Sequence, residues 1–383
     1  MNQPEHHNIF LYGVCNLMVQ STQSMLESIM LNQPRALVIG GGIAGLQASL
    51  DLADHGFQVY VVEKEAHLGG TAWKLSKLFP TLRGAEETVR PIVERVVVNP
   101  NIRVVNSAEV KSVQGSIGDF RAKITSHASS DSSALDEEIL ADVIIVATGF
   151  GQYDAHKLGQ YKYGQYQNVI TGLEYEEMCK LNGRTQGKIL RPDNGQAPKS
   201  VVFILCAGSR DEKHLRYCCN LGCLNAIKHA HLLRGQYGKD VNAYVCYTDV
   251  RAVTKAGEQF YNKVRAEEVE FVHGQPSEVR QAPDGSLTLD VYDQATSKLL
   301  SISADLVVLE MGLQPNIEMA EMLGLKLTDD GFIMEKDAQL LVNETTVAGI
   351  FLAGAVQQPM HTHQAVVHAS AAALRAMSAL QAQ

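Results

Sequence analysis

The 383-residue chain has no long run of basic residues, no Cys-x-x-Cys pair and no stretch near the roughly 20 uninterrupted apolar residues of a membrane span. Without a basic run it lacks the phosphate-neutralising surface of a nucleic-acid binder, so we expect no nucleic-acid partner. Because glycines and charges interrupt every apolar stretch, we expect no membrane association. The first 34 residues contain no Lys or Arg, which argues against a secretory leader and predicts a cytoplasmic protein.

The composition is that of ordinary globular domains, with 45% hydrophobic residues, 20% charged residues, 31 glycines and a net charge of −9. It excludes a disordered, collagen-like or coiled-coil chain. A chain of this length predicts about two to three domains, each with enough apolar residues for its own core.

A glycine-rich turn near the start of the chain predicts a dinucleotide site. The apolar strand Ala36–Ile39 runs into Gly40, Gly42 and Gly45, a helical stretch follows, and the next strand ends at Glu63. In this arrangement the first glycine allows the tight turn, the second admits a pyrophosphate and the third lets helix and strand pack closely. The pyrophosphate then lies at the positive end of the helix, and Glu63 accepts from ribose hydroxyls.

The chain repeats this plan, which indicates an internal duplication of a dinucleotide-binding fold. The two strands Ala141–Gly149 and Ala304–Gly312 share the pattern Ala-Asp-apolar-Gly and close corresponding units. We expect an N-terminal segment at 1–34, a first domain formed by 35–181 and 313–383, and a second, Rossmann-like domain at 182–312. The Gly-, Pro- and Asn-rich residues 182–199 are the expected surface connection between them.

Four of the seven cysteines fall within 18 residues of the second half: Cys206, Cys218, Cys219 and Cys223. Cys206 stands where the first half has Gly40, and no glycine fingerprint follows it. The irregular spacing favours a [4Fe–4S] cluster over zinc, which usually takes paired Cys-x-x-Cys knuckles. Zinc binding and plain burial as small apolar side chains remain alternatives. The isolated Cys179 and Cys246 are expected to serve packing, and Cys15 is ambiguous.

At the C-terminal end, the strand from Gly349 runs into a small-residue turn at Gly354 and Ala355, and an alanine-rich helix follows from His363. A strand that ends at a helix N-terminus is where a flavoprotein of two dinucleotide-binding domains holds the ribityl chain and the pyrimidine edge of its flavin. The helix dipole there stabilises an anionic reduced flavin. His361 and His363 either tune that edge or merely cap the helix, and the cap is favoured.

From Ala36 to its end the chain resembles the A-type subunit of heterodisulfide reductases. The resemblance covers the following stretches: Ala36–Thr81, Ala141–Gly149, Tyr163–Glu176, Val202–Ala230, Val245–Phe260, Gly349–Gln358 and Gln364–Ala373. It implies an α/β fold with two Rossmann-like domains arranged as in thioredoxin reductase, with FAD in the first domain and a [4Fe–4S] cluster near the flavin. The expected FAD contacts are Gly40, Gly42, Ile43, Ala44, Gly45, Glu63, Lys64, Gly70, Thr71, Val110, Ala147, Thr148, Gly149, Gly354, Ala355, His363 and Gln364.

The resemblance also assigns the cluster ligands. The family has a cysteine after the strand, one after a tyrosine and an adjacent pair at the helix start, and Cys206, Cys218 and Cys223 match directly. Gly222 stands where another ligand is expected, so Cys219 is inferred as the substitute. Lys228, five residues after Cys223, is expected either to aim at flavin N5 as a catalytic group or to be a solvated helix lysine.

Larger members of that family carry additional clusters that this sequence lacks. No cysteine follows Phe79 and Pro80 up to Val98, the N-terminal segment is short, and no ferredoxin motif is present. The chain is therefore similar to the short A-type subunit of the heterodisulfide-reductase-like complexes of sulfur oxidisers. It is expected to store and relay electrons without bifurcation, as a homodimer working with B- and C-type subunits.

Two other functions remain open at this point. One is a stand-alone NAD(P)H-dependent flavin disulfide reductase, which would need a second glycine fingerprint and a Cys-x-x-Cys pair. The other is a scaffold subunit without redox function, in which FAD is structural.

Overall fold

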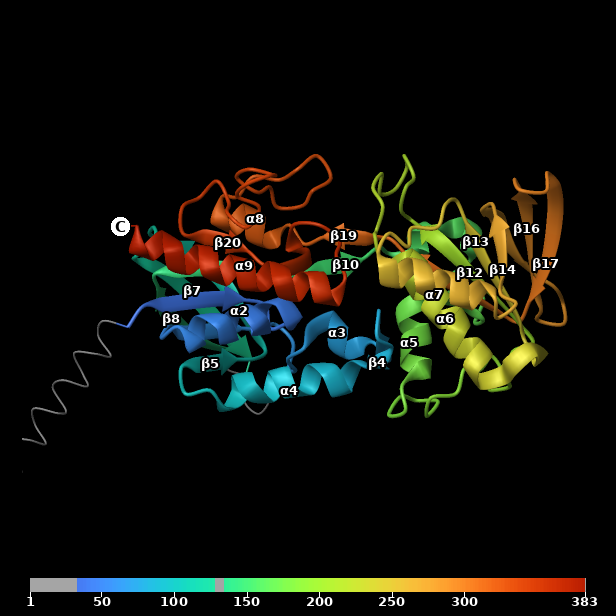
Figure 1. Cartoon of the computed structure of the whole chain (residues 1–383), viewed down its shortest axis with the longest axis horizontal. Helices are drawn as coiled ribbons and strands as arrows, with labels where there is room; N and C mark the ends of the chain where they lie inside the picture. Colours follow the sequence, from blue (N-terminus) through green and yellow to red (C-terminus); the bar gives the residue numbers. More distant parts are fainter. Residues whose placement is uncertain (1–32, 128–133, 383) are drawn as a thin grey trace, which may run out of the picture.

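The computed structural model describes residues 33–127 and 134–382, which form two lobes lying end to end along the long axis (Figure 1). The expected N-terminal segment, apart from its last two residues, and Cys15 lie outside the described residues. The first lobe is built on a parallel sheet of five strands in the order β20-β9-β1-β2-β5. The bounds of these strands are Arg35–Ile39 for β1, Gln58–Val62 for β2, Ile102–Val105 for β5, Val143–Val146 for β9 and Ile350–Leu352 for β20.

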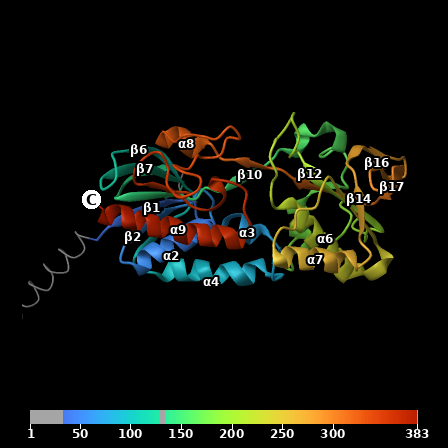
Figure 2. The same ribbon diagram turned by 45° about the horizontal axis from the view of Figure 1, so that its top comes forward.

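Alternating side chains of β1 enter two different cores, one on each face of the first sheet. Ala36 and Val38 pack against helices, and Leu37 and Ile39 pack against a three-stranded antiparallel meander and α8. Both faces are covered, which explains why the strands are almost continuously apolar. The helices are α2 (Ile43–Asp54), α4 (Ala85–Val98) and α9 (Thr362–Gln381), and α9 runs beside α2 (Figure 2). The other face carries β6 (Ala108–Gln114), β7 (Phe120–His127), β8 (Ala134–Ala141) and α8 (Glu318–Leu323).

The second lobe repeats the order of four strands of the first sheet, whereas its edge strand β11 comes before the others in the chain and the first sheet's edge strand β20 comes after them. Its sheet has the order β11-β18-β12-β13-β14, with β11 at Val169–Thr171, β12 at Ser200–Ala207, β13 at Asn242–Tyr247, β14 at Glu270–His273 and β18 at Leu306–Met311. A meander of β15 (Pro276–Gln281), β16 (Leu287–Asp293) and β17 (Lys298–Ala304) and helices α5 (Gly172–Cys179), α6 (Gly222–Tyr237) and α7 (Lys255–Arg265) complete it. The matching strand orders confirm the expected duplication.

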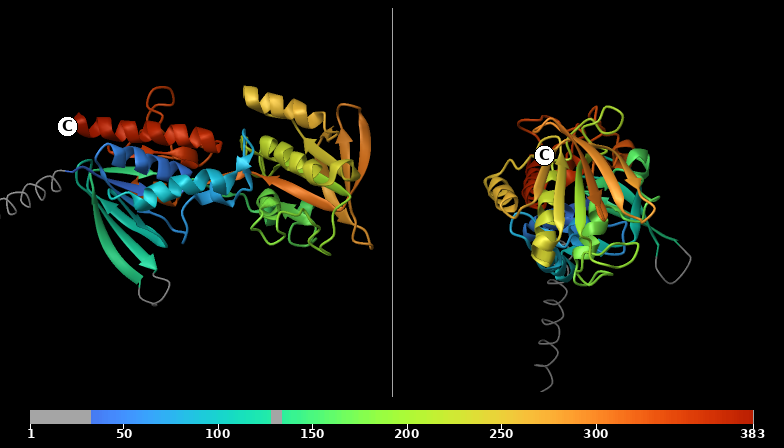
Figure 3. Two further views of the ribbon diagram at one scale, coloured as in Figure 1. Left: turned by 60° about the horizontal axis from the view of Figure 1, so that its bottom comes forward. Right: turned by 90° about the vertical axis from the view of Figure 1, so that its right-hand side faces the viewer.

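The two lobes are joined by a pair of short antiparallel strands, β10 (Phe150–Gln152) and β19 (Leu313–Pro315), which are labelled between the lobes in Figure 1. The left view of Figure 3 shows that the molecule is narrow in this region. The hydrogen bonding does not change lobe at residue 182, because β11 already pairs with β18 of the second sheet. We therefore propose that the domain boundary lies at β10 and β19 and that 153–181 belong to the second lobe.

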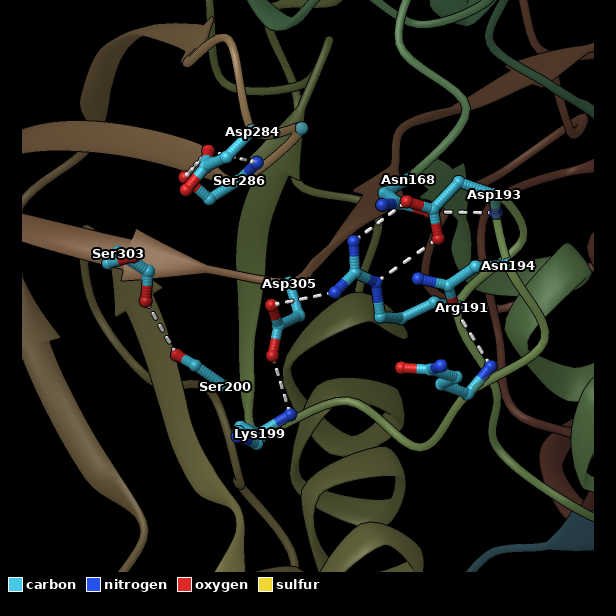
Figure 4. Close-up of polar contacts among 12 residues, drawn as sticks. Asn168, Arg191, Asp193, Asn194, Lys199, Ser200, Asp284, Ser286, Ser303 and Asp305 are labelled. Carbon is cyan, nitrogen blue, oxygen red and sulfur yellow. Dashed lines mark hydrogen bonds and ion pairs between the residues drawn. The ribbon is translucent and has the colours of Figure 1, made fainter.

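Residues 182–199 are pinned to the second lobe instead of forming a free connection (Figure 4). The Arg191 guanidinium donates to the Asp193 carboxylate at 2.7 and 3.1 Å and to Asp305 Oδ1 at 3.3 Å. Asp305 Oδ2 also accepts from the Lys199 backbone N–H at 2.6 Å, and Asn168 Oδ1 accepts from the Asp193 N–H at 3.2 Å. These contacts tie the segment to the residues that directly precede β18 and β11.

The remaining short elements lie mostly between the larger ones: α3 (Gly70–Lys74), β3 (Lys77–Leu78), β4 (Arg83–Gly84) and the 3-10 turns η1 (Ala155–Lys157), η2 (Gly159–Tyr161), η3 (Gly238–Asp240) and η4 (Gly354–Val356). Among the helices of residues 33–127 and 134–382, none has both the length and the apolarity to cross a lipid bilayer.

Candidate functional site

The glycine turn between β1 and α2 has the geometry that its spacing predicts. Gly40 has φ +109°, and a Cβ there would lie 2.4 Å from the Ala147 carbonyl oxygen. A Cβ at Gly45 would lie 1.9 Å from the Gly40 carbonyl oxygen, so helix and turn touch at that point. At Gly42, by contrast, a Cβ would meet only the Gly70 Cα, at 3.9 Å, among the described residues. The space beside Gly42 is therefore free of protein, as close approach of a pyrophosphate requires.

Glu63 is held in place by hydrogen bonds, one of which comes from the glycine turn between β1 and α2. Its buried carboxylate accepts from the Gly41 N–H at 2.6 Å and from the Glu65 N–H at 2.8 Å. Each carboxylate oxygen has a second lone pair, so Glu63 keeps capacity to accept from a ribose hydroxyl. The adjacent Lys64 is exposed, and Val110 is buried in the core beneath the meander.

Other expected contacts gather at the same edge of the first sheet. The Gly69–Gly70 turn lies against the glycine loop, since Gly42 forms a bridge with Gly69, and Thr71 lies just inside α3. Ala147, Thr148 and Gly149 continue from the end of β9. Within the described part of the chain, the buried Thr148 hydroxyl has no hydrogen-bond partner.

The C-terminal turn brings a second helix N-terminus to this edge. A Cβ at Gly354 would lie 2.6 Å from the Ala44 Cβ and 3.7 Å from the Ala365 Cβ, so η4 packs between the first turns of α2 and α9. His361 caps α9, and Gln364 Oε1 accepts from its backbone N–H at 2.9 Å. The His363 ring stacks on the His361 ring with centroids 5.9 Å apart. Burial and the neighbouring His363 lower the pKa of His361 to about 4.

This edge fits a dinucleotide. The Gln357 side-chain oxygen, next to η4, is a second buried polar atom that has no partner in the described residues. Two helix N-termini, a turn free of side chains and two such polar atoms would suit a phosphate group and hydrogen-bonding ring edges. The residues that would hold FAD are those of the glycine turn, Glu63, the end of β9 and the start of α9.

The four clustered cysteines extend from the end of β12 to the first turn of α6. Cys206, in β12, has φ +57°, and Asn220, inside the loop, also has φ +57°. Burial raises the pKa of Cys223 to about 12, the Arg251 N–H opposes this, and charge at Cys206 and Cys218 adds to the rise. Cys206, Cys218 and Cys223 are thus near enough to influence one another, and Cys218 hydrogen-bonds to Cys219.

Two of the four sulfurs accept hydrogen bonds from backbone N–H groups of the loop. The Asn220 N–H donates to Cys218 Sγ at 3.3 Å, and the Gly222 N–H donates to Cys219 Sγ at 3.3 Å. The hydrogen bond from Cys219 lowers the pKa of Cys218 to about 6, and the same contact raises the pKa of Cys219. Backbone N–H donors aimed at sulfur suit anionic cluster ligands. Across residues 33–127 and 134–382, no three His, Cys, Asp or Glu side chains already stand in metal-ligating geometry.

The cysteine loop contacts the first lobe next to the proposed cofactor edge. Asn220 Nδ2 donates to the Pro359 carbonyl at 3.3 Å, two residues before the N-cap of α9. This contact brings the loop that carries the thiols to the helix terminus where a flavin edge is expected.

Lys228 is buried, so the solvated alternative does not hold. Its Nζ lies 2.5 Å from Glu176 Oε1 and donates to the Lys77 carbonyl, in β3 of the first lobe, at 3.0 Å. His229 lies between Glu176 and Glu310 and contacts each at 2.7 Å. Sequence reasoning missed Glu176, His229 and Glu310 as a group. The available signal was Glu310, a charged residue in the otherwise apolar strand β18.

The chain is similar to known redox proteins. A family profile described as pyridine nucleotide-disulphide oxidoreductase matches residues 34–187 and 236–369. The first of two A-type iron-sulfur subunits of the CoB--CoM heterodisulfide reductase of Methanopyrus kandleri is 35% identical over 422 residues, which cover 89% of this chain and 63% of the relative. The A-type subunit of the H(2):CoB-CoM heterodisulfide,ferredoxin reductase of Methanothermobacter marburgensis is 35% identical over 418 residues, with the same two shares. The chain thus spans about 63% of the length of these curated relatives, and their names confirm the resemblance inferred from the motifs.

Solved structures with the same fold include two thioredoxin reductases. That of T. acidophilum has a TM-score of 0.62 at 19% identity and covers 90% of this chain and 97% of its own. That of Lactococcus lactis has a TM-score of 0.62 at 17% identity, with shares of 92% and 100%. They confirm the expected pair of Rossmann-like domains.

Proposed function

The chain belongs to the pyridine nucleotide-disulphide oxidoreductase family, and on that premise we propose that it is an electron-transfer subunit that holds FAD and a [4Fe–4S] cluster. It would correspond to the A-type subunit of a heterodisulfide-reductase-like complex. The observation that carries this proposal is the contact of Asn220, inside the cysteine loop, with Pro359 at the approach to α9.

FAD would occupy the carboxyl edge of the first sheet. There it would supply a group that accepts and releases electrons one or two at a time. The protein residues would place the pyrophosphate beside Gly42, the adenosine ribose near Glu63 and the flavin edge near the N-terminus of α9. The positive end of α9 would favour negative charge at that edge.

The cluster would be held by Cys206, Cys218, Cys219 and Cys223. In the second lobe this loop replaces the glycine turn of the first, so the lobe is not built to grip a second nucleotide by the same turn. Arg210 contributes to this setting, because its positive charge opposes the pKa increase that burial causes at Cys206. A cysteine-rich loop next to a flavin edge suits electron relay better than disulfide exchange.

Electrons would pass between partner B- and C-type subunits, the cluster and FAD. We place this activity in cytoplasmic sulfur oxidation, without bifurcation, and we propose a homodimer as the working form. Relay without bifurcation is supported by the single cysteine-rich loop of this sequence, because two separate electron routes would need more than one such loop.

The test is anaerobic purification of the chain followed by analysis of flavin, iron and sulfide. We expect one FAD with four irons and four sulfides per chain, as the proposed cofactors imply. Cys219→Ser should lose most of the iron and retain the flavin. Cys179→Ser is the matched control, because Cys179 ends α5 outside the loop, and it should retain both.

Iron-free protein that binds FAD would overturn the relay proposal. If NADH then bleached the flavin of the isolated chain rapidly, the chain would be a self-sufficient flavin reductase. A bound flavin that stays oxidised throughout a reductive titration would instead indicate a structural cofactor in a scaffold subunit.

A further inference from the structure

Four charged side chains form a continuous buried chain between α5, α6 and β18. Glu310 contacts His229, His229 contacts Glu176, and Glu176 contacts Lys228. The side chains of Lys228, His229 and Glu176 are each 1% exposed, and that of Glu310 is 4% exposed. Charges buried to this degree are costly unless they are paired, so their arrangement demands an explanation.

The geometry at His229 requires one more proton than a neutral imidazole carries. Both ring nitrogens lie 2.7 Å from a carboxylate oxygen, Nδ1 from Glu310 and Nε2 from Glu176. An ionised carboxylate only accepts hydrogen bonds, so both nitrogens must donate, or else one carboxyl group must itself be protonated. In either case Glu310, His229 and Glu176 together hold one proton more than two carboxylates and a neutral imidazole would.

This buried charged chain of four side chains ends at the boundary between the lobes. Lys228 Nζ donates to the Lys77 carbonyl of β3, and the charge of Lys228 contributes to lowering the pKa of His361, the N-cap of α9. The hydroxyl and N–H of Ser76 donate to Glu176 Oε2 at 2.6 and 2.7 Å. The Lys228 end of the buried charged chain is thus next to the edge at which a flavin is proposed.

We propose that Glu310, His229, Glu176 and Lys228 form a proton store that supplies one proton at Lys228 Nζ when a flavin at the boundary between the lobes is reduced. This inference rests on the proposed function and deepens it. His229 is the residue that holds the exchangeable proton, and the two glutamates are positioning residues that fix its ring.

The proton count balances. At the start the two carboxylates carry −2 and the lysine and imidazolium carry +2. Lys228 breaks one N–H bond and gives that proton to the reduced flavin, whose electrons come from a partner protein of the complex. The Nε2 proton of His229 then passes through Glu176 Oε1 to Lys228 Nζ and restores the ammonium group. After these transfers His229 is a neutral imidazole and the four side chains carry a net charge of −1. Reoxidation of the flavin reverses each step.

The surroundings keep the store isolated. His229 faces Glu176 and the Tyr175 ring from α5, Glu310 from β18 and the Phe203 ring from β12, and its neighbour in α6 is Lys228. Tyr175 donates its hydroxyl to the His229 carbonyl, and burial raises the pKa of that tyrosine, so Tyr175 does not titrate with the store. A Cβ at Gly172, in the first turn of α5, would lie 2.8 Å from Glu310 Oε2, so this carboxylate lies at a positive helix end.

The first experiment is nitrogen NMR of the isolated, cofactor-free chain with labelled histidine. At about pH 8, above the ordinary histidine range, we expect one histidine with both ring nitrogens protonated and slowly exchanging. His229→Gln should remove that signal. The matched control is His231→Gln, two residues further along α6, whose ring pairs with Glu267 alone and is partly exposed, and it should leave the signal in place.

The second experiment counts protons from the pH dependence of the flavin midpoint potential. Around neutral pH, His229→Gln should take up one proton more from solvent per electron pair than the wild type, in which the store supplies that proton, and His231→Gln should take up the same number as the wild type. Glu310→Gln, which preserves shape, should give the doubly protonated signal at lower pH only. This variant and the wild-type NMR keep the test sound if His229→Gln does not fold.

A neutral His229 ring at neutral pH would overturn the proposal, and so would an unchanged proton count in folded His229→Gln. The two failures are distinguishable. Protein that shows the NMR signal and binds no flavin refutes the proposed function, and the store then has no acceptor. Protein that shows the signal and binds flavin, with an unchanged count, refutes the proton store alone.

Discussion

Two glycines of the same turn face different surroundings, and this difference gives a test of cofactor binding. Gly45 lies against the Gly40 carbonyl, whereas Gly42 has an ordinary backbone conformation, with φ −72°, and free space beside it. We predict that Gly42→Ala changes the free energy of unfolding of cofactor-free protein by less than about 0.5 kcal/mol, yet lowers FAD affinity at least about tenfold. Denaturant unfolding and a flavin-binding titration measure the two effects.

Gly45→Ala should instead destabilise the cofactor-free protein, because its Cβ would overlap a backbone oxygen. Gly235→Ala is the control. Its position in α6 is one at which a Cβ would have no described atom within 4 Å, so this change should stabilise the helix by about 0.5–1 kcal/mol and leave FAD binding intact. Equal flavin affinity in Gly42→Ala and wild type would refute the pyrophosphate position.

The buried histidine predicts how stability depends on pH. Burial lowers the pKa of His229, but the charges and hydrogen bonds of Glu310 and Glu176 outweigh burial, so the pKa is raised above 6.5. A raised native pKa means that the stabilisation is fully present below the unfolded value near 6.5 and is lost as the pH rises through the native pKa. We therefore expect the free energy of unfolding to fall across this alkaline interval in the wild type. His229→Gln should abolish this fall and His231→Gln should retain it, as urea titrations at several pH values would show.

At the residue scale, the glycine turn could be predicted from sequence because its function depends on local spacing. The buried charged chain could not. Glu176 and Glu310 are 134 positions apart, and whether each charge is buried depends on how α5, α6 and β18 pack. Gly172 and Gly222 lie against Glu310 in the folded protein, a contact that nothing local in the sequence indicates.

At the element scale, the long strands and helices were predictable, and the short strand β11 was not. The apolar stretch Ala36–Ile39 became β1, and the alanine-rich helix became α9 with an N-terminus one residue earlier than expected. β11 has only three residues, which is too short for a periodic pattern, so its place in the second sheet was missed. The start of α5, by contrast, has a local signal, because Thr171 and Glu174 have capping-box spacing and form that box in the structure.

The segment 182–199 had the composition of a linker, but Arg191 fixes it to the second lobe. We predict that Arg191→Ala lowers the free energy of unfolding by about 1.5–3 kcal/mol, because the charged hydrogen bonds to Asp193 and Asp305 are lost at a position only 17% exposed. Arg280→Ala, which removes an Arg–Asp pair from the exposed surface of the meander, should cost at most about 1 kcal/mol. Denaturant unfolding compares the two variants, and equal losses would contradict the anchoring role.

At the scale of the whole molecule, the proposed relay requires the two lobes to stay docked. The contacts between them include Ser76 with Glu176, Lys228 with the Lys77 carbonyl, and Asn220 with Pro359. Each joins a first-lobe residue near the cofactor edge to a second-lobe residue of the charged chain or the cysteine loop. Docking and the chemistry of the site therefore depend on the same few hydrogen bonds.

Ser76→Ala tests this dependence. The Ser76 hydroxyl donates at 2.6 Å to a buried carboxylate, and its loss should weaken docking by about 1.5–3 kcal/mol, the usual range for a hydrogen bond to a charged group. Hydrogen exchange should then accelerate in β3 and β4 while the centres of both sheets stay protected. Asn182→Ala, which removes an exposed contact with Glu86 between the lobes, is the control and should leave exchange unchanged. Unaltered protection of β3 and β4 in Ser76→Ala would show that the lobes are held together by other contacts and that the buried carboxylate does not govern their docking.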